Sequence, residues 1–176
     1  LAGAMAQAGA RVLVLEAETQ FRDRVRGEAI MPWGVAEVKA LSLEDTLVQA
    51  NANPLTYWDS YQGEERFGHR SLVTTTKAGE PVQACYHPDL QEELLRRAED
   101  LGATVRRGSR VTGVETGPQP AVSLTLDESE RKFTARLVVG ADGRGSSVRA
   151  WAGFEVKQDP EKSWWPECCW KEWRCQ

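Results

Sequence analysis

The segment that decides the fold reads LVVGADGRGSSVR and runs from residue 137 to residue 149. Its apolar, β-branched opening is too short for a helix and is typical of a buried strand. Gly140 and Gly143 then permit a tight turn with positive φ, and Ser146 or Ser147 can cap a short helix. Such a strand, turn and helix N-terminus present backbone N–H groups to an anion. An ordinary turn between a strand and a helix of an α/β domain explains the same pattern.

The first residues predict a helix followed by a strand. Residues 1–9 are rich in alanine, and Gly9 stands where a helix C-cap belongs. RVLVLE (11–16) then predicts a buried strand that ends in Glu16. This order is the second half of a βαβ dinucleotide-binding unit, in which the acid accepts hydrogen bonds from an adenosine ribose; a solvated strand-end acid is the alternative. The glycine-rich loop of such a unit would lie before Leu1, so we expect the chain to be a piece of a longer protein.

An arginine-rich segment and two helices are predicted next. FRDRVRGEAI (21–30) alternates arginines with other residues, which suits an extended segment. A solvated run of charges explains it, and an arginine that reaches a phosphate or ribose is the alternative. Pro32 can open a helix, and LSLEDTLVQA (41–50) predicts a second one.

The middle of the chain changes from helical to β-rich periodicity. Strands of a mixed or antiparallel sheet are predicted for LTYWDSY (55–61), RSLVTTT (70–76) and VQACY (82–86). The aromatic side chains of the first of these strands, Tyr57, Trp58 and Tyr61, are expected to pack in the interior rather than to form a binding site.

A long amphipathic helix and a β-meander are predicted for the rest of the domain. HPDLQEELLRRAEDLG (87–102) has Pro88 in its first turn, leucines along one face and Gly102 at its end. Three further segments predict the strands of a meander: 103–115, 122–126 and 132–142.

Length, charge and cysteine content limit the possible functions. The 176 residues suit about one domain, and the net charge of −4 gives no reason to expect nucleic acid or an anionic membrane as a partner. No run is apolar enough to span a bilayer, and the first residues do not have the basic-then-apolar pattern of a leader, so we do not expect secretion. The four cysteines are expected to be free thiols rather than metal ligands, as in the cytoplasm. Residues 157–176 form an irregular tail rich in Trp and Cys.

Four features in this order resemble the FAD-binding region of the flavoprotein aromatic hydroxylases, the p-hydroxybenzoate hydroxylase-like family. They are RVLVLE, VRGEAI, the helix LQEELLRRAEDLGA, and LVVGADGRGSSVR, the last of which resembles the family's Asp-Gly motif. The resemblance covers residues 1–156. It implies an α/β fold: a partial Rossmann-like FAD-binding domain with a parallel sheet and an added antiparallel β-meander, without the first strand and its glycine-rich loop.

The same resemblance implies which residues hold the cofactors. Glu16 would bind the adenosine ribose of FAD, and Arg26 would lie near the ribityl–pyrophosphate portion. The backbone at Val111 would meet the adenine. Asp142 and Gly143 would position the pyrophosphate region and serve NAD(P)H.

The implied function is that of an FAD-dependent monooxygenase. Such an enzyme reduces FAD with NAD(P)H and, with O₂, hydroxylates an aromatic or similar small molecule, so no metal or catalytic nucleophile is expected in the chain. A flavin-dependent halogenase or isoprenoid reductase shares the scaffold. An inactive remnant or a nucleotide-binding module is the non-enzymatic alternative. We expect this chain alone to bind FAD weakly or not at all, because a glycine loop supplies much of the hold on the pyrophosphate. The sequence indicates no oligomeric state.

Overall fold

A computed structural model describes residues 1–24, 28–126, 129–143 and 145–157. The chain divides into two compact units, one formed by Leu1–Val12 with Gln20–Thr104 and the other by Leu13–Thr19 with Val105–Gln176. Together they hold parallel and antiparallel strands and several helices, which confirms the predicted α/β class. None of the helices in the described ranges is long and apolar enough to cross a membrane.

The helices of the first unit lie where the sequence predicts them, with one addition. They are α1 (Ala2–Gln7), α2 (Pro32–Ala40), α3 (Glu44–Gln49), α4 (Leu72–Thr75) and α5 (His87–Asp100). Gly9 follows α1 with a φ of 85° and Gly102 follows α5 with a φ of 97°, so both helices end at a left-handed glycine. Pro32 occupies the first turn of α2.

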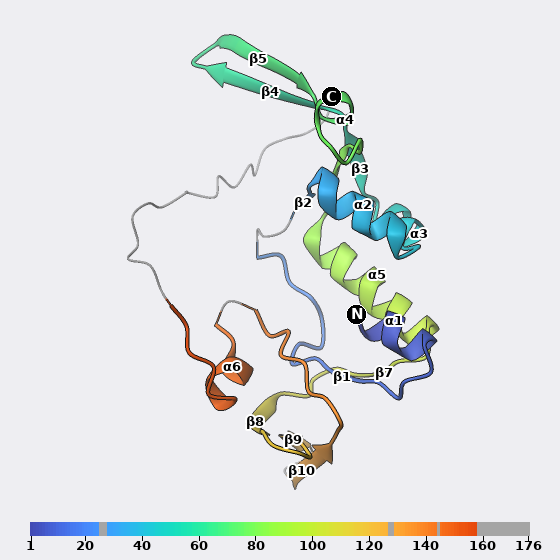
Figure 1. Cartoon of the computed structure of the whole chain (residues 1–176), viewed down its shortest axis with the longest axis vertical. Coiled ribbons are helices and arrows are strands. Elements are labelled where there is room, and N and C mark those ends of the chain that lie inside the picture. Colours follow the sequence, from blue (N-terminus) through green and yellow to red (C-terminus); the bar gives the residue numbers. More distant parts are fainter. Residues whose placement is uncertain (25–27, 127–128, 144, 158–176) are drawn as a thin grey trace. The chain divides into compact units, whose positions relative to one another are not determined.

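Two helices of this unit, α1 and α3, pack against α5. Figure 1 shows α1 beside one end of α5, where a side chain at Gly3 would place its Cβ only 2.8 Å from Leu101 Cδ1. Glycine therefore allows the two helices to approach closely. A buried cluster joins α3 to the start of α5 and consists of Leu47, Ala50, Cys85 and Leu90. Cys85 is buried and forms no disulfide with another described residue; the other three cysteines lie outside the described residues.

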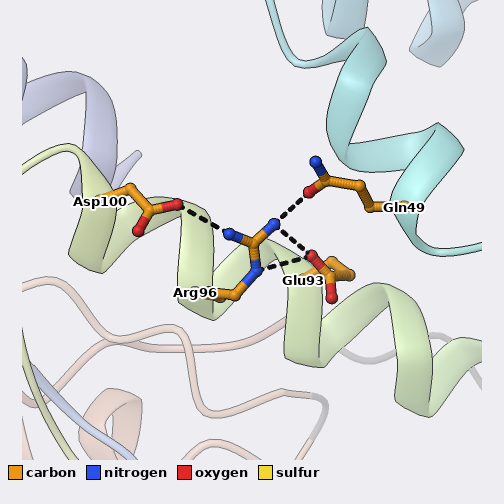
Figure 2. A network of polar contacts seen from close by, with 4 residues as sticks. All are labelled: Gln49, Glu93, Arg96 and Asp100. Carbon is orange, nitrogen blue, oxygen red and sulfur yellow. Dashed lines mark hydrogen bonds and ion pairs between the residues drawn. The ribbon is translucent and has the colours of Figure 1, made fainter.

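An exposed polar network also links α3 to α5. In Figure 2 the Arg96 guanidinium donates to Glu93 Oε2 at 2.7 and 2.9 Å and to Asp100 Oδ2 at 3.0 Å, and it also bonds Gln49 of α3. Glu93 and Asp100 lie three and four residues from Arg96, the spacings that place helical side chains side by side.

The strands of the first unit form two small antiparallel sheets. One contains β2 (Ala29–Ile30), β6 (Val82–Ala84) and β3 (Asn53–Leu55); the other is the hairpin β4 (Tyr57–Gln62) and β5 (Glu65–Ser71).

Two predictions for this region are wrong. The strand expected over 70–76 stops at Ser71, because the Ser71 hydroxyl accepts a hydrogen bond from the Thr74 N–H and caps α4. The side chains of Tyr57, Trp58 and Tyr61 are each more than half exposed rather than packed inside. They lie on the β4–β5 hairpin, which pairs with no further strand among the described elements.

The second unit combines a parallel strand pair with the predicted meander. β1 (Leu13–Leu15) pairs with β7 (Thr104–Arg106), and the bonds Thr104 N–Val12 O and Glu16 N–Arg106 O advance together along both strands, so the pair is parallel. The meander has the order β10 (Ser129–Thr134), β9 (Ala121–Leu126), β8 (Val111–Glu115) and is antiparallel throughout. Its central strand buries Leu124 completely. The helix α6 (Ser147–Trp151) contacts β8.

The segment Leu137–Val139 differs from its prediction. It is extended but belongs to no sheet, and the side chains of Leu137 and Val139 are 62% and 52% exposed. An apolar run becomes a buried strand only when neighbouring strands bond its backbone on both sides. No other part of the described chain pairs with this segment.

Candidate functional site

Glu16 is held in place by the end of the parallel strand pair. Its backbone N–H donates to the Arg106 carbonyl at 2.9 Å, and its own carbonyl accepts from the Ser109 N–H at 2.9 Å. The Oε1 atom accepts from the Glu18 N–H at 2.8 Å, which fixes the half-buried side chain. The other carboxylate oxygen has no hydrogen bond within the described chain, so it can accept one from a ligand hydroxyl.

Val111 follows a residue that is hydrogen-bonded to Glu16. It is the first residue of β8 and faces Leu124 across the ladder. Only Arg110 separates it from Ser109, whose N–H donates to the Glu16 carbonyl. The structure therefore brings the segment that leads into Val111 beside Glu16. Arg26, in contrast, lies outside the described residues.

Asp142 binds the start of α6. Its Oδ1 atom accepts a 2.5 Å hydrogen bond from the Ser146 hydroxyl, and its Oδ2 atom accepts a 3.1 Å bond from the Val148 N–H. The Ser146 hydroxyl in turn accepts from the Arg149 N–H at 3.0 Å, so Ser146 is the predicted N-cap. The sequence predicted that this helix end would present N–H groups to an anion. The anion that it binds in the structure is the carboxylate of Asp142.

These hydrogen bonds also determine the ionisation of Asp142. The Ser146 hydroxyl, followed by the Val148 N–H, lowers the pKa of the Asp142 carboxyl below its ordinary value of 3.8. The carboxylate is therefore negative at neutral pH. A fixed negative charge attracts hydroxyl and amide donors of a ligand and repels its phosphates.

The two glycines of the loop serve different purposes. Gly143 has a φ of 83°, the left-handed conformation predicted for it, and a Cβ there would meet no atom within 4 Å. A ligand can thus approach its backbone closely. Gly140 is not among the residues with positive φ, contrary to the prediction. Its Cβ would stand 2.7 Å from Val148 Cγ1, so Gly140 is needed for the close packing of the loop on α6.

We expect Gly140→Ala to destabilise the second unit by about 1 kcal/mol, because the added methyl forces Val148 and the loop apart. The matched control is Gly145→Ala in the same loop, where a Cβ would meet nothing within 4 Å. Thermal unfolding followed by circular dichroism compares the two variants. Equal midpoints for both would contradict the packing role of Gly140.

The predicted residues Glu16, Val111, Asp142 and Gly143 all belong to the second unit. A hydrogen bond joins Glu16 to Ser109, which precedes Val111 by two residues, and α6, whose first turn donates to Asp142, contacts β8. These groups fit the adenosine half of FAD, since they offer a free carboxylate oxygen to a ribose and an open glycine backbone to the neighbouring atoms. Within the described ranges no cluster of His, Cys, Asp and Glu could hold a metal ion.

Comparison with known proteins gives consistent relatives. The family model described as FAD binding domain matches residues 1–168. A 12-dehydrotetracycline 5-monooxygenase/anhydrotetracycline 6-monooxygenase from Streptomyces rimosus is 43% identical over 39% of this chain and 14% of its own length. Rifampicin monooxygenase from Streptomyces venezuelae is 27% identical over 92% of this chain and 33% of its own length.

Solved structures agree with the sequence relatives. The OxyS anhydrotetracycline hydroxylase from Streptomyces rimosus superposes with a TM-score of 0.72 at 28% identity, over 90% of this chain and 32% of that protein. Aklavinone-11 hydroxylase, solved with FAD and aklavinone, has the same fold, with a TM-score of 0.71 at 23% identity over 86% of this chain and 32% of that protein. This chain spans a third or less of the length of each of these four proteins.

Proposed function

Because this chain belongs to the FAD-binding domain family of the flavoprotein aromatic hydroxylases, we propose that it is the FAD-binding part of a monooxygenase. The enzyme would use FAD, NAD(P)H and O₂ to hydroxylate an aromatic or similar small molecule. The names of the relatives, which are monooxygenases and hydroxylases, favour oxygen transfer over the halogenase and reductase alternatives.

The observation that carries the proposal is the placement of Glu16 at the end of a parallel strand. It has one carboxylate oxygen fixed by the Glu18 N–H and the other available. In dinucleotide-binding units an acid at this position accepts hydrogen bonds from the ribose hydroxyls. Bound FAD would supply the redox and oxygen chemistry. The chain's own residues would bind and orient the cofactor.

Three further contacts follow from the proposal. The backbone near Val111 would meet the adenine, because Ser109 is bonded to Glu16. The backbone of Gly143 would approach the pyrophosphate region, where no Cβ obstructs it. Asp142 would act mainly through this loop, since both of its oxygens already accept hydrogen bonds from the start of α6.

Glu16→Gln is expected to weaken FAD binding about tenfold, because a charged acceptor of ribose hydroxyls is lost. The measurement is a titration of the purified 176-residue chain with FAD, followed by quenching of flavin fluorescence. Glu130→Gln removes the same charge from an exposed position on β10 and serves as the control. We expect the unmodified chain to bind weakly and reversibly. Equal affinities of the Glu16 and Glu130 variants would contradict the role of Glu16.

The oxygenase activity belongs to a protein of the relatives' length, so its test begins with the encoding DNA. Reading both flanks in frame is expected to give a longer product that oxidises NADH or NADPH with O₂ only when FAD is bound. A frame that is bounded at these 176 residues would count against the enzyme and favour a remnant or binding module. The FAD titration remains informative in either case.

A further inference from the structure

The second unit contains a pocket that the proposed FAD contacts do not use. It has a volume of about 390 Å³ and lies between the end of β8, the extended segment that follows β10, and α6. This volume falls in the range of small-molecule sites. Its apolar wall includes Leu137, Val148 and Phe154, and three charged residues line it: Glu115, Arg136 and Arg149.

The charges in the pocket do not balance. Both carboxylate oxygens of Glu115 accept from Lys132 Nζ at 2.6 Å, so that negative charge is already paired. Neither Arg136 nor Arg149 forms an ion pair within the described ranges. The pocket therefore presents two cationic groups that have no counter-ion in this part of the chain.

One of these arginines has a buried donor without an acceptor. The Nε atom of Arg149 is inaccessible to solvent and has no hydrogen-bond partner among the described residues. A donor that water cannot reach is also closed to a ligand while the side chain keeps this position, so the attraction of Arg149 for an anion in the pocket comes from the charge and the remaining donors of its guanidinium. A guanidinium matches a carboxylate best, because its planar fork donates two parallel hydrogen bonds.

We propose that this pocket binds a small organic carboxylate with an apolar, preferably aromatic, body. The carboxylate would pair with Arg149 and Arg136, and the body would lie against Leu137 and Phe154. A bare inorganic anion would leave the apolar wall in water and lose that contribution. The pocket would thus be a second ligand site. It would bind an anion through arginines, whereas the proposed FAD site uses the Glu16 carboxylate to bind ribose hydroxyls.

The probe for this site is 2-naphthoate, and its neutral match is 2-naphthalenemethanol, which has the same ring system without the charge. We expect isothermal titration of the full chain to show 2-naphthoate binding at least tenfold more tightly than the alcohol. No binding of 2-naphthoate, or equal affinities of the two compounds, would overturn the proposal.

Variants place the ligand in the pocket. Arg136→Met and Arg149→Met keep a long apolar stem, and each is expected to weaken 2-naphthoate binding about tenfold while leaving the alcohol nearly unchanged. Arg131→Met on β10 makes the same charge change outside the pocket and is expected to have no effect. Arg136 is exposed, so its replacement tests the site even if Arg149→Met destabilises the fold. If Arg131→Met and Arg136→Met weaken 2-naphthoate binding equally, the binding depends only on the net charge of the chain, and the proposed site is wrong.

Discussion

Leu124→Ala is expected to destabilise the β-meander by about 2–5 kcal/mol, the usual cost of a leucine-to-alanine cavity in a core. Leu124 is fully buried, and its strand β9 is bonded by β8 on one side and by β10 on the other. The surrounding ladder restricts the collapse of the cavity, so the lost contacts are not replaced. Amide hydrogen exchange of the three strands measures this loss in the second unit itself.

Leu137→Ala is the matched control, since it removes the same atoms from a side chain that is 62% exposed. Its effect is expected to stay within about 0.5 kcal/mol, as for most surface substitutions. Hydrogen exchange is preferred to a single melting curve because a chain of two compact units need not unfold in one step. Similar protection factors in both variants would show that β9 does not form the core of the meander.

The sequence predicted those elements whose signals are local. The helix α5 follows from leucine periodicity, Pro88 and Gly102. The meander follows from alternating segments separated by turn residues. The cap at Ser146 follows from a serine placed just before the helix. In each case a few consecutive residues determine the conformation.

The incorrect predictions concern residues whose conformation depends on segments that are distant in the sequence. Leu137–Val139 has the composition of a buried strand, but pairing decides whether such a run enters a sheet. Tyr57 and Trp58 are of residue types that usually pack in a core, but both are exposed. Their burial depends on whether another layer covers the hairpin, which the local sequence does not indicate.

The site was predicted in part for the same reason. The sequence could predict that Glu16 follows a strand and that Gly143 adopts a left-handed turn conformation. The bonds from Asp142 to Ser146 and Val148 could not, although the spacings of four and six residues are compatible with them. No pattern in the sequence indicates that Arg136 and Arg149 line one pocket, since only the fold brings them together.

Asp142→Ala is expected to lower the stability of the second unit at neutral pH by about 2 kcal/mol, the upper end for loss of a side-chain acceptor at a helix start. The substitution leaves the Val148 N–H and the Ser146 hydroxyl without their common acceptor. It also removes a negative charge from the positive end of the α6 backbone. Asp142→Asn keeps one acceptor oxygen and is expected to cost about half as much.

The pH dependence of stability shows whether Asp142 stabilises α6 through its charge or through the shape of its side chain. The folded-state pKa of Asp142 lies below the ordinary value of 3.8, so the unfolded chain binds a proton more readily than the folded chain. The stabilisation by this carboxylate is therefore complete above the unfolded pKa and disappears as the pH falls through the folded one. Thermal midpoints of the unmodified chain and of Asp142→Asn should differ at pH 7 and converge in strong acid.

A control variant isolates this effect from the general loss of negative charge. Glu130→Gln removes one exposed carboxylate from β10, and its midpoint is expected to follow that of the unmodified chain at every pH. A gap between Asp142→Asn and the unmodified chain that stays constant into acid would mean that side-chain shape, not charge, holds the loop to α6. If only the Asp142→Asn midpoint approaches that of the unmodified chain in acid, the negative charge of Asp142 stabilises the start of α6. The backbone of Gly143 would then be the part of the Asp-Gly motif left to meet a cofactor.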